Sequence, residues 1–283
     1  MKKSGALEFY PPAETLDHVG GLDLLKDWLR VKTRAFTAEA RAAGVDAPRG
    51  VLMIGVPGCG KSLTAKAISS FWQLPLLRFD VGRVFSKWIG ASEENMRGAI
   101  RLSESLAPSI LWIDEIEKGF SGLGASDSVD AGVTARVLST FLTWMQEKKA
   151  TVFVVATANQ VKRLPPEFLR KGRFDEIFYV DLPTVPERRE IAAIHLAKRK
   201  KDPTKYDLDK LAAGSEGYTG ADIEAACKES VEQAFADGKE HNTELVLEVM
   251  KKSVPLSVTM REEIGFLRQW QEGRARPASS RKP

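Results

Sequence analysis

The sequence predicts an α/β protein in which a five-stranded parallel sheet is followed by a small all-helical domain. From residue 50 onward, short apolar runs alternate with amphipathic, helix-like stretches, which is typical of βα units packed as a parallel sheet. Several of these runs are apolar nearly throughout, as expected for strands covered on both faces. After the segment DLPTVPERRE (181–190) the strand-like runs stop, so we place a domain boundary near Pro183 to Pro186.

Each element follows from the same patterns, in chain order. Strands are expected at 50–55, 74–81, 109–114, 151–158 and 176–182. In the first part, helices are expected to begin at Ser62 and in the segment ASEENMR; in the second they are expected at 187–201, 206–215, 219–238 and 243–254. Thr219 is expected to cap the third of these, with Asp222 as its partner three residues on. The chain divides into an N-terminal extension (1–14), an α/β domain (15–184), a helical domain (185–253) and a C-terminal helix with a basic tail (254–283).

The composition is that of an ordinary soluble globular chain, with 283 residues of which 43% are hydrophobic and 28% charged. No apolar run reaches the ~18 residues of a membrane span, and no signal peptide follows the N-terminal lysines, so we expect a cytoplasmic protein. Two cysteines, Cys59 and Cys227, fit a reducing compartment and offer no metal cluster. The net charge is +4, and the visible basic excess lies in the tail RARPASSRKP. We expect this tail to be disordered; contact with nucleic acid is the less favoured alternative.

The segment GVPGCGKS (55–62) fits the pattern GxxxxGK[ST], follows an apolar strand and opens a helix. Glycines let successive backbone N–H groups turn toward phosphate oxygens at a helix N-terminus. Lys61 adds a cation near the β and γ phosphates, and the Ser62 hydroxyl can hold Mg²⁺. The pattern predicts nucleotide contacts from Pro57, Gly58, Cys59, Gly60, Lys61, Ser62 and Leu63. A chance glycine-rich turn and a redox role for Cys59 are less favoured alternatives.

Two adjacent acids, Asp114 and Glu115, close the predicted strand SILWID. Acids rarely end a buried strand without a partner, so we expect Asp114 to hold the Mg²⁺ shell and Glu115 to orient and activate water. The next strand ends in Asn159, which is well placed to position the attacking water; capping a turn is its alternative role. Together the three residues predict a hydrolase.

Arg170 and Arg173 stand three residues apart in PPEFLRKGRFDEIF, before the fifth strand. A solvated or salt-bridged arginine is the ordinary interpretation. ATPases of this general kind commonly complete the transition-state charge with an arginine from a neighbouring chain. In that case the active site is a property of an interface.

The segments GVPGCGKS, ILWIDE, VVATAN, FLRKGRFDE and GYTGADIEAACKES, in this order and with these gaps, resemble an AAA ATPase of the katanin, spastin and proteasomal-ATPase type, over roughly residues 15 to 238. The resemblance implies an AAA+ P-loop domain at 15–184, a lid domain at 185–253, and ATP hydrolysis with Mg²⁺. It also implies nucleotide contacts from His18, Val19, Gly20, His195, Gly220 and Ala221. For His195 a half-buried helix histidine is the alternative. The end segment VPLSVTMREEIGFLRQW resembles an AAA family of cyanobacteria and plastid genomes, catalogued as a hypothetical chloroplast reading frame, which implies the plastid stroma if the chain is plastid-encoded.

The family resemblance implies a homo-hexameric ring with ATP between neighbouring protomers. Lys87, Trp88, Ile89 and Gly90 resemble the family's pore loop, in which an exposed Trp grips an extended polypeptide substrate. Packing of Trp88 into the core is the alternative. A second channel loop is expected in 121–134. The expected function is a Mg²⁺-dependent ATPase ring that remodels or threads proteins; an ATP-gated switch or scaffold, and less favourably a nucleic-acid motor or loader, are the alternatives.

The sequence departs from the family pattern in three places. RKGR stands where RPGR is common, which leaves both arginines in place. Gln146, Glu147 and Lys148 stand where many relatives carry the Asp-Gly-Phe that passes nucleotide state between subunits, so this signal is in doubt. The chain also starts almost at the ATPase module, so we expect either a missing N-terminal domain or a separate adaptor to select the substrate.

Overall fold

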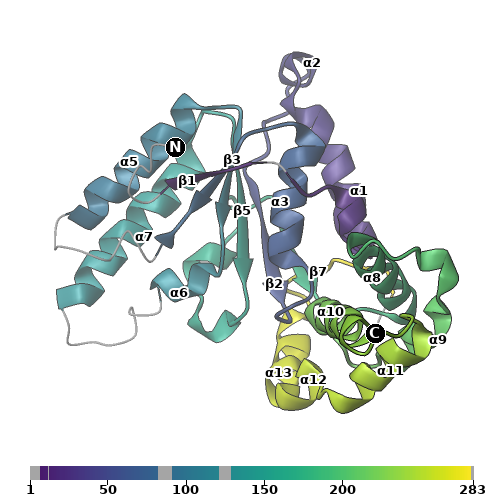
Figure 1. Ribbon diagram of the computed structural model, residues 1–283. Helices are drawn as coiled ribbons and strands as arrows, with labels where there is room; N and C mark the ends of the chain where they lie inside the picture. Colours follow the sequence, from purple (N-terminus) through teal and green to yellow (C-terminus); the bar gives the residue numbers. More distant parts are fainter. Residues whose placement is uncertain (1–6, 12, 82–90, 121–128, 282–283) are drawn as a thin grey trace. The chain divides into compact units, whose positions relative to one another are not determined.

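The computed structural model describes residues 7–11, 13–81, 91–120 and 129–281 (Figure 1). The chain forms two compact units that alternate along the sequence. The first unit draws on residues 1–16, 26–54 and 62–179, and the second on residues 17–25, 55–61 and 180–283. The four-part division expected from the sequence stays a prediction.

The first unit is built on a mostly parallel sheet with the strand order β1-β3-β4-β5-β2-β6. The strands are β1 (Leu7–Tyr10), β2 (Gly50–Gly55), β3 (Leu76–Phe79), β4 (Ser109–Ile113), β5 (Val152–Ala158) and β6 (Glu176–Val180). The pairs β3–β4, β4–β5 and β2–β5 are parallel, and every residue of β2, β4 and β5 is buried. All five predicted strands are therefore confirmed, each to within two residues at either end.

One strand was not predicted. β1 pairs antiparallel with β3 at the edge of the sheet, with Leu7 opposite Phe79. Its four residues, LEFY, are too few to show a period, and pairing with β3 depends on contacts far along the chain. The ring of Tyr10 meets that of Trp112 on β4 edge-on, with 5.7 Å between centroids. Part of the predicted N-terminal extension is thus an edge strand of the sheet.

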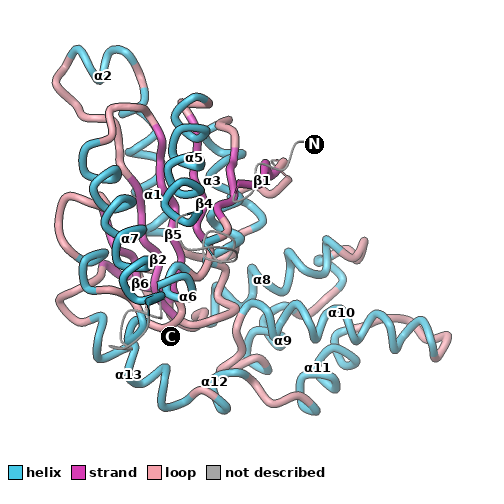
Figure 2. Tube along the Cα trace, turned by 90° about the vertical axis from the view of Figure 1, so that its left-hand side faces the viewer, coloured by secondary structure: helices cyan, strands magenta, loops and turns pink. Residues whose placement is uncertain are grey.

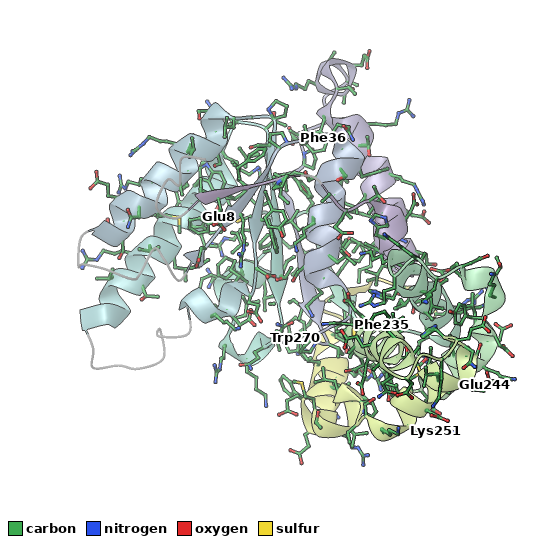
Figure 3. All side chains as sticks on the ribbon, viewed as in Figure 1. Glu8, Phe36, Phe235, Glu244, Lys251 and Trp270 are labelled. Carbon is green, nitrogen blue, oxygen red and sulfur yellow. The ribbon has the colours of Figure 1, made fainter. Side chains whose placement is uncertain are left out.

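Helices cover both faces of this sheet. The helices in this part of the chain are α1 (Asp23–Thr33), α2 (Ala38–Ala42), α3 (Lys61–Trp72), α5 (Ala91–Ser105), α6 (Ile116–Phe120) and α7 (Val129–Glu147). Figure 1 shows α1 and α3 on one side of the sheet and α5 and α7 on the other. The core on the side of α1 and α3 is aromatic. The centroid of the Phe153 ring lies 4.7 Å from that of Trp72 and 6.4 Å from that of Trp28. The ring of Phe36, labelled in Figure 3, lies 4.8 Å from Trp72, also between centroids. This packing holds β5 and α3, which carry functional candidates, in one core.

The second unit contains a helical bundle of four helices, seen in Figure 2 as α8 (Val185–Lys198), α9 (Leu208–Gly214), α10 (Gly220–Ala236) and α11 (Thr243–Lys252). Their buried core includes Leu196, Leu211 and Ile223. The hydroxyl of Thr219 accepts the N–H of Asp222 at 3.2 Å, and the Asp222 carboxylate accepts the N–H of Thr219 at 2.9 Å. The predicted cap of α10 and all four predicted helices are confirmed.

The C-terminal part adds α12 (Leu256–Thr259), α13 (Arg261–Gln271) and the two-residue strand β7 (Arg276–Pro277). The expectation of a disordered tail is wrong for its described residues. Ala278 is buried and its carbonyl accepts the N–H of Leu25 at 3.1 Å; the N–H of Ser280 donates to Asp23 at 2.8 Å. Small residues between the arginines allow this close approach, and charge composition alone gives no sign of it.

Candidate active site

The P-loop joins β2 to α3, as the sequence predicts. Gly58 and Gly60 have φ angles of +75° and +87°, a region that residues with a side chain rarely adopt. A Cβ on Gly58 would lie only 2.9 Å from the Thr219 hydroxyl. The buried Lys61 ammonium donates to the carbonyls of Gly55 at 2.9 Å and Val56 at 2.7 Å. The loop therefore has the glycine-dependent backbone of a phosphate cradle, with its cation held against the loop's own carbonyls.

Cys59 lies in the same loop beside an apolar cluster formed by Val56, Leu182 and Ile264. Burial raises the pKa of its thiol to about 12, and Asp181 acts in the same direction against the opposing charge of Lys61. Since the thiolate is the reactive form, a redox switch at Cys59 is disfavoured. The second cysteine, Cys227, is buried in the helical bundle, where burial also raises its pKa to about 12.

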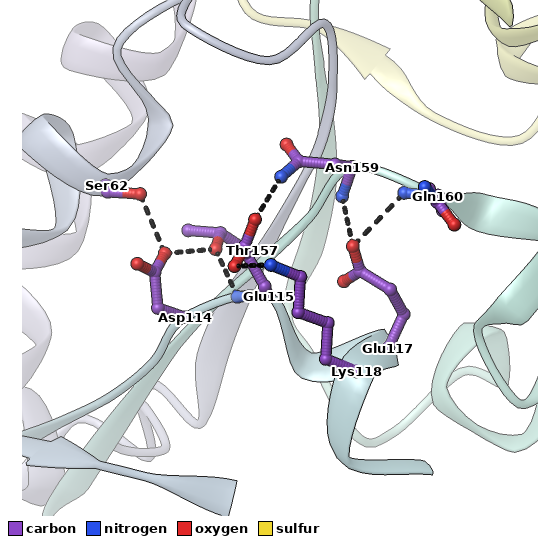
Figure 4. Close-up of polar contacts among 8 residues, drawn as sticks. All are labelled: Ser62, Asp114, Glu115, Glu117, Lys118, Thr157, Asn159 and Gln160. Carbon is purple, nitrogen blue, oxygen red and sulfur yellow. Dashed lines mark hydrogen bonds and ion pairs between the residues drawn. The ribbon is translucent and has the colours of Figure 1, made fainter. Parts of the chain in front are cut away.

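Asp114 and Ser62 come together in the first unit (Figure 4). The Ser62 hydroxyl donates to Asp114 Oδ1 at 2.7 Å, and the Thr157 hydroxyl on β5 donates to the same oxygen at 2.7 Å. A hydroxyl beside a carboxylate forms the all-oxygen donor set that Mg²⁺ prefers in proteins. The residues present therefore fit the metal expected from the sequence.

Glu115 is held at three points. Its N–H donates to the Thr157 hydroxyl at 2.9 Å, its Oε1 accepts the side-chain amide of Asn159 at 2.9 Å, and its Oε2 pairs with the Lys118 ammonium at 2.5 Å (Figure 4). Its backbone is left-handed, with φ of +49°. For a residue with a side chain this conformation costs about 1–3 kcal/mol, and such strain clusters at functional sites.

Glu117, on α6, contacts the segment that follows β5. Its side chain is only 2% exposed, and its Oε1 accepts the N–H groups of Asn159 at 3.0 Å and Gln160 at 3.3 Å. Burial raises the pKa of this carboxyl, and the neighbouring Glu115 adds to the effect.

Sequence reasoning missed three residues of this network: Thr157, Glu117 and Lys118. Thr157 left a signal, since it is the polar residue of the apolar run VFVVATA and lies on the same face of the strand as Asn159 two residues later. Glu117 and Lys118 left none, because charged residues at the start of a helix are ordinary.

In the second unit, the segment expected to bind the base lies against α8. Val19 is buried, and a Cβ on Gly20 would lie 2.6 Å from Ile191 on α8. Two acids of α8 hold the following turn: Glu190 accepts the N–H of Gly21 at 2.9 Å, and Glu187 accepts the N–H of Leu22 at 3.1 Å.

The N-terminus of α10 meets the P-loop within this unit. The N–H of Ala221 donates to the Gly58 carbonyl at 3.0 Å, and a Cβ on Gly220 would lie 3.9 Å from Ile191. Ile191 is thus a neighbour of both Gly20 and Gly220. The unit brings together the predicted base segment, the P-loop and the predicted lid contact.

The two predicted histidines differ in their surroundings. His18 is half-buried in a short turn at Leu16–His18. His195 is buried on α8, with its Nδ1 3.7 Å from the carboxylate of Glu224. The structure places His195 on the helix that carries Ile191, one turn further on.

Arg170 and Arg173 follow a short turn at Pro166–Leu169. Arg170 is exposed, whereas the half-buried Arg173 donates its guanidinium to the carbonyl of Glu167 within its own chain. Of the two, Arg170 has the side chain more available to a neighbouring molecule.

The expected pore loop, Lys87 to Gly90, lies outside the described residues, as does most of the second candidate channel loop at 121–134. Helix α5 begins at Ala91, where the sequence predicts a helix start. At the departure in 146–148, Gln146 and Glu147 are exposed at the end of α7, and the Lys148 ammonium donates to the Val152 carbonyl. Burial lowers the pKa of Lys148 to about 8.

Comparison with known proteins agrees with this geometry. A family model described as the ATPase family associated with various cellular activities (AAA) matches residues 51–182, and an AAA+ lid domain model matches residues 205–248. The chain is 50% identical over 281 residues to the AAA domain-containing protein ycf46 of Pyropia yezoensis, covering 99% of this chain and 57% of that protein. It is 46% identical over 281 residues to the protein of the same name from Guillardia theta, covering 99% of this chain and 55% of that protein.

A more distant relative is a Cell division cycle protein 48 homolog of Archaeoglobus fulgidus, 34% identical over 219 residues, covering 76% of this chain and 30% of that protein. The chain spans little more than half the length of the ycf46 relatives that it matches. The AAA model spans the P-loop and the acids that close β4, and the lid model spans much of the helical bundle. The chain therefore belongs to the AAA family of ATPases and carries its ATPase domain together with its lid.

Proposed function

We propose that this chain binds ATP with Mg²⁺ and hydrolyses it to ADP and phosphate. The observation that carries the proposal is the network in which Ser62, directly after the P-loop lysine, bonds Asp114, while Glu115 bonds Asn159. Family membership supports it, since the matching family is one of ATPases.

The P-loop residues have the binding role. Backbone N–H groups of 58–63 and the Lys61 ammonium would contact the phosphates, and Pro57, which has no N–H, would line the loop. Ser62 and Asp114 would hold Mg²⁺, which when bound neutralises phosphate charge. His18, Val19, Gly20, His195, Gly220 and Ala221 would contact the base and ribose, and the contacts of Ile191 with Gly20 and Gly220 add that side chain to the set.

Glu115 and Asn159 have the hydrolytic role. The Glu115 carboxylate would accept a proton from the attacking water, and the Asn159 amide would fix the orientation of that carboxylate and of the water. Both oxygens of Glu115 are engaged, by Asn159 and by Lys118, so water must displace Lys118 or share its oxygen.

We further propose a homo-hexameric ring in which Arg170, or Arg173, completes the site of a neighbouring subunit. The exposure of Arg170 favours it as the main contributor. The ring would remodel or thread protein substrates past Trp88 and Ile89, a role that rests on the sequence resemblance alone. An adaptor or a further domain would select the substrate.

The proposed location is the plastid stroma if the chain is plastid-encoded, and the cytoplasm otherwise. Within the described part of the chain, no helix is both long and apolar enough to cross a membrane.

Mixing two inactive variants tests the proposal. Arg170→Ala keeps an intact Glu115, and Glu115→Gln keeps an intact Arg170. If the arginine acts between subunits, each variant alone is inactive and their mixture regains hydrolysis at the interfaces that combine the two intact residues. Hydrolysis by Arg170→Ala alone at the wild-type rate contradicts the role of Arg170. A mixture that stays inactive contradicts its action between subunits.

The pore role is tested separately. Electron microscopy of Glu115→Gln with ATP is expected to show a closed or spiral ring with density through its channel, and a monomer would contradict the ring. Trp88→Ala is expected to keep ATP hydrolysis and lose protein remodelling. Biological output that survives Trp88→Ala but not Glu115→Gln would instead favour the ATP-gated switch.

A further inference from the structure

We infer that Glu117 is a positioning residue for ATP hydrolysis: its carboxylate fixes the backbone beyond β5 so that the Asn159 side chain meets Glu115. The inference rests on the proposed function, because it assigns a role in that same site. Nothing in the sequence pattern pointed to this residue, and the geometry of Figure 4 does.

The contact itself is specific. β5 ends at Ala158, and the N–H groups of the next two residues, Asn159 and Gln160, both point at Glu117 Oε1, at 3.0 and 3.3 Å. One oxygen that accepts two successive N–H groups fixes the orientation of two consecutive peptide units. The segment beyond the strand is therefore held in a single conformation by one side chain, which is almost fully buried.

Asn159 is consequently held at two points by one short segment. Its backbone N–H bonds Glu117, and its side-chain amide bonds Glu115, only two residues earlier in the chain. A side chain reaches a fixed point only if its own backbone is fixed, so the Glu115–Asn159 contact depends on the Glu117 contact. Misplacement of a group near the chemistry by about 1 Å can cost a factor of about 100 in rate.

The contacts of Glu117 do not give the most stable arrangement that the fold could have at this position. Among the described residues, Glu117 Oε2 has no hydrogen-bond partner although the side chain is buried. Leaving a buried polar atom unpaired is costly, and a well-packed apolar side chain often serves stability better than a buried charged one. The strained backbone of Glu115 adds a second cost at the same place. Costs concentrated at one point are typical of functional rather than structural positions.

Steady-state ATP hydrolysis with saturating Mg²⁺ tests the inference. Glu117→Ala removes both contacts, and we expect kcat to fall about tenfold or more while KM for ATP changes by less than about threefold, since the P-loop is untouched. Glu117→Gln retains an oxygen that accepts the same two N–H groups and is expected to recover most of that loss. Glu117→Asp keeps the charge on a shorter side chain and is expected to resemble Ala.

Two further variants separate positioning from a general structural role. In an Asn159→Ala background, Glu117→Ala is expected to lower kcat by no more than about twofold, because the residue acts through Asn159. Glu104→Ala is the matched control: it removes a part-buried carboxylate that accepts the indole N–H of Trp144 at 2.9 Å, away from the site. We expect it to lower the melting temperature and to leave kcat unchanged.

Three results would overturn the inference: wild-type kcat in Glu117→Ala, multiplicative losses in the double variant, or a kcat in Glu117→Gln as low as in Ala. If Glu117→Ala fails to fold, Glu117→Asp, Glu117→Gln and the double variant Glu117→Asp/Asn159→Ala decide the question by the same comparisons. A wild-type protein that hydrolyses no ATP overturns the proposed function itself. An active wild type with an unaffected Glu117→Ala overturns only the positioning role.

Discussion

Thr157 offers the most direct perturbation of the network, because its hydroxyl lies between the two acids that close β4. It donates to Asp114 Oδ1 at 2.7 Å and accepts the N–H of Glu115 at 2.9 Å, and the side chain is only 1% exposed. Thr157→Val keeps the branched shape and removes only these two bonds. Any change in activity then reports on the positions of Asp114 and Glu115.

The magnitude follows from the two bonds. A hydrogen bond to a charged group is worth about 1.5–3 kcal/mol, and an N–H left unpaired in a buried place costs about 1–3 kcal/mol. Because Asp114 keeps its bond to Ser62 and is partly solvated, we expect the unfolding free energy to fall by about 2–4 kcal/mol. Glu115 loses one hold on its strained backbone, and we expect kcat to fall by about tenfold to a hundredfold, or about 1.4–2.7 kcal/mol of activation free energy.

Phosphate release at saturating ATP, with Mg²⁺ varied, measures the fall in kcat, and denaturant unfolding measures the fall in the unfolding free energy. Thr243→Val is the control: this buried hydroxyl accepts the N–H of Asp207 at 3.0 Å in the helical bundle, so its loss should lower stability and spare kcat. A Thr157→Val protein with wild-type kcat and wild-type Mg²⁺ dependence would show that this hydroxyl does not position Asp114 and Glu115.

Measurable effects are also expected in the second unit. Glu187→Ala removes the acceptor of the Leu22 N–H and the Ser279 hydroxyl; we expect the unfolding free energy to fall by about 1–3 kcal/mol and ATP to bind more weakly, which thermal melts and nucleotide titration would measure. Burial lowers the pKa of His241 below its ordinary 6.5, and Lys201 adds to the effect, so the unfolded state takes up the proton first. The contribution of His241 to the unfolding free energy should therefore be intact above pH 6.5 and fall as the pH drops below it. In denaturant unfolding, His241→Gln should lose less stability than the wild type over this pH range. With a pKa of about 12, Cys59 should react with iodoacetamide far more slowly in the folded than in the unfolded protein at neutral pH, and equal rates would contradict the raised pKa.

Local patterns predicted the five strands, and the residues that they singled out include two hydrogen-bonded pairs, Ser62 with Asp114 and Glu115 with Asn159. The P-loop is recognisable from Gly58, Gly60 and Lys61 within a few residues, and Asp114 follows a nearly continuous apolar run. These signals are local because a parallel strand covered on both faces needs continuous apolar residues, and a phosphate cradle needs glycine at fixed positions.

The missed features depend on contacts between segments far apart in sequence. Glu117 contacts Asn159, 42 residues later, only because β4 and β5 are neighbours in the sheet. The residues of these two strands do not reveal which strand lies beside which. The same holds for β1, a short segment that forms a strand by pairing with β3. It also holds for Ala278, whose carbonyl accepts the N–H of the distant Leu25. Amino-acid composition gives the average environment of such residues, but not the particular residues that they contact in the fold.

Glu115 is proposed as the base of an ATP-hydrolysing site. Nucleotide binding and phosphate release by the wild type and by Glu115→Gln, measured on the same samples with Mg²⁺, test this role. Since general-base catalysis contributes about 10²–10⁴-fold, the variant should bind ATP with nearly the wild-type Kd and release phosphate at about a hundredth of the wild-type rate or less. Hydrolysis by Glu115→Gln at the wild-type rate would contradict this role.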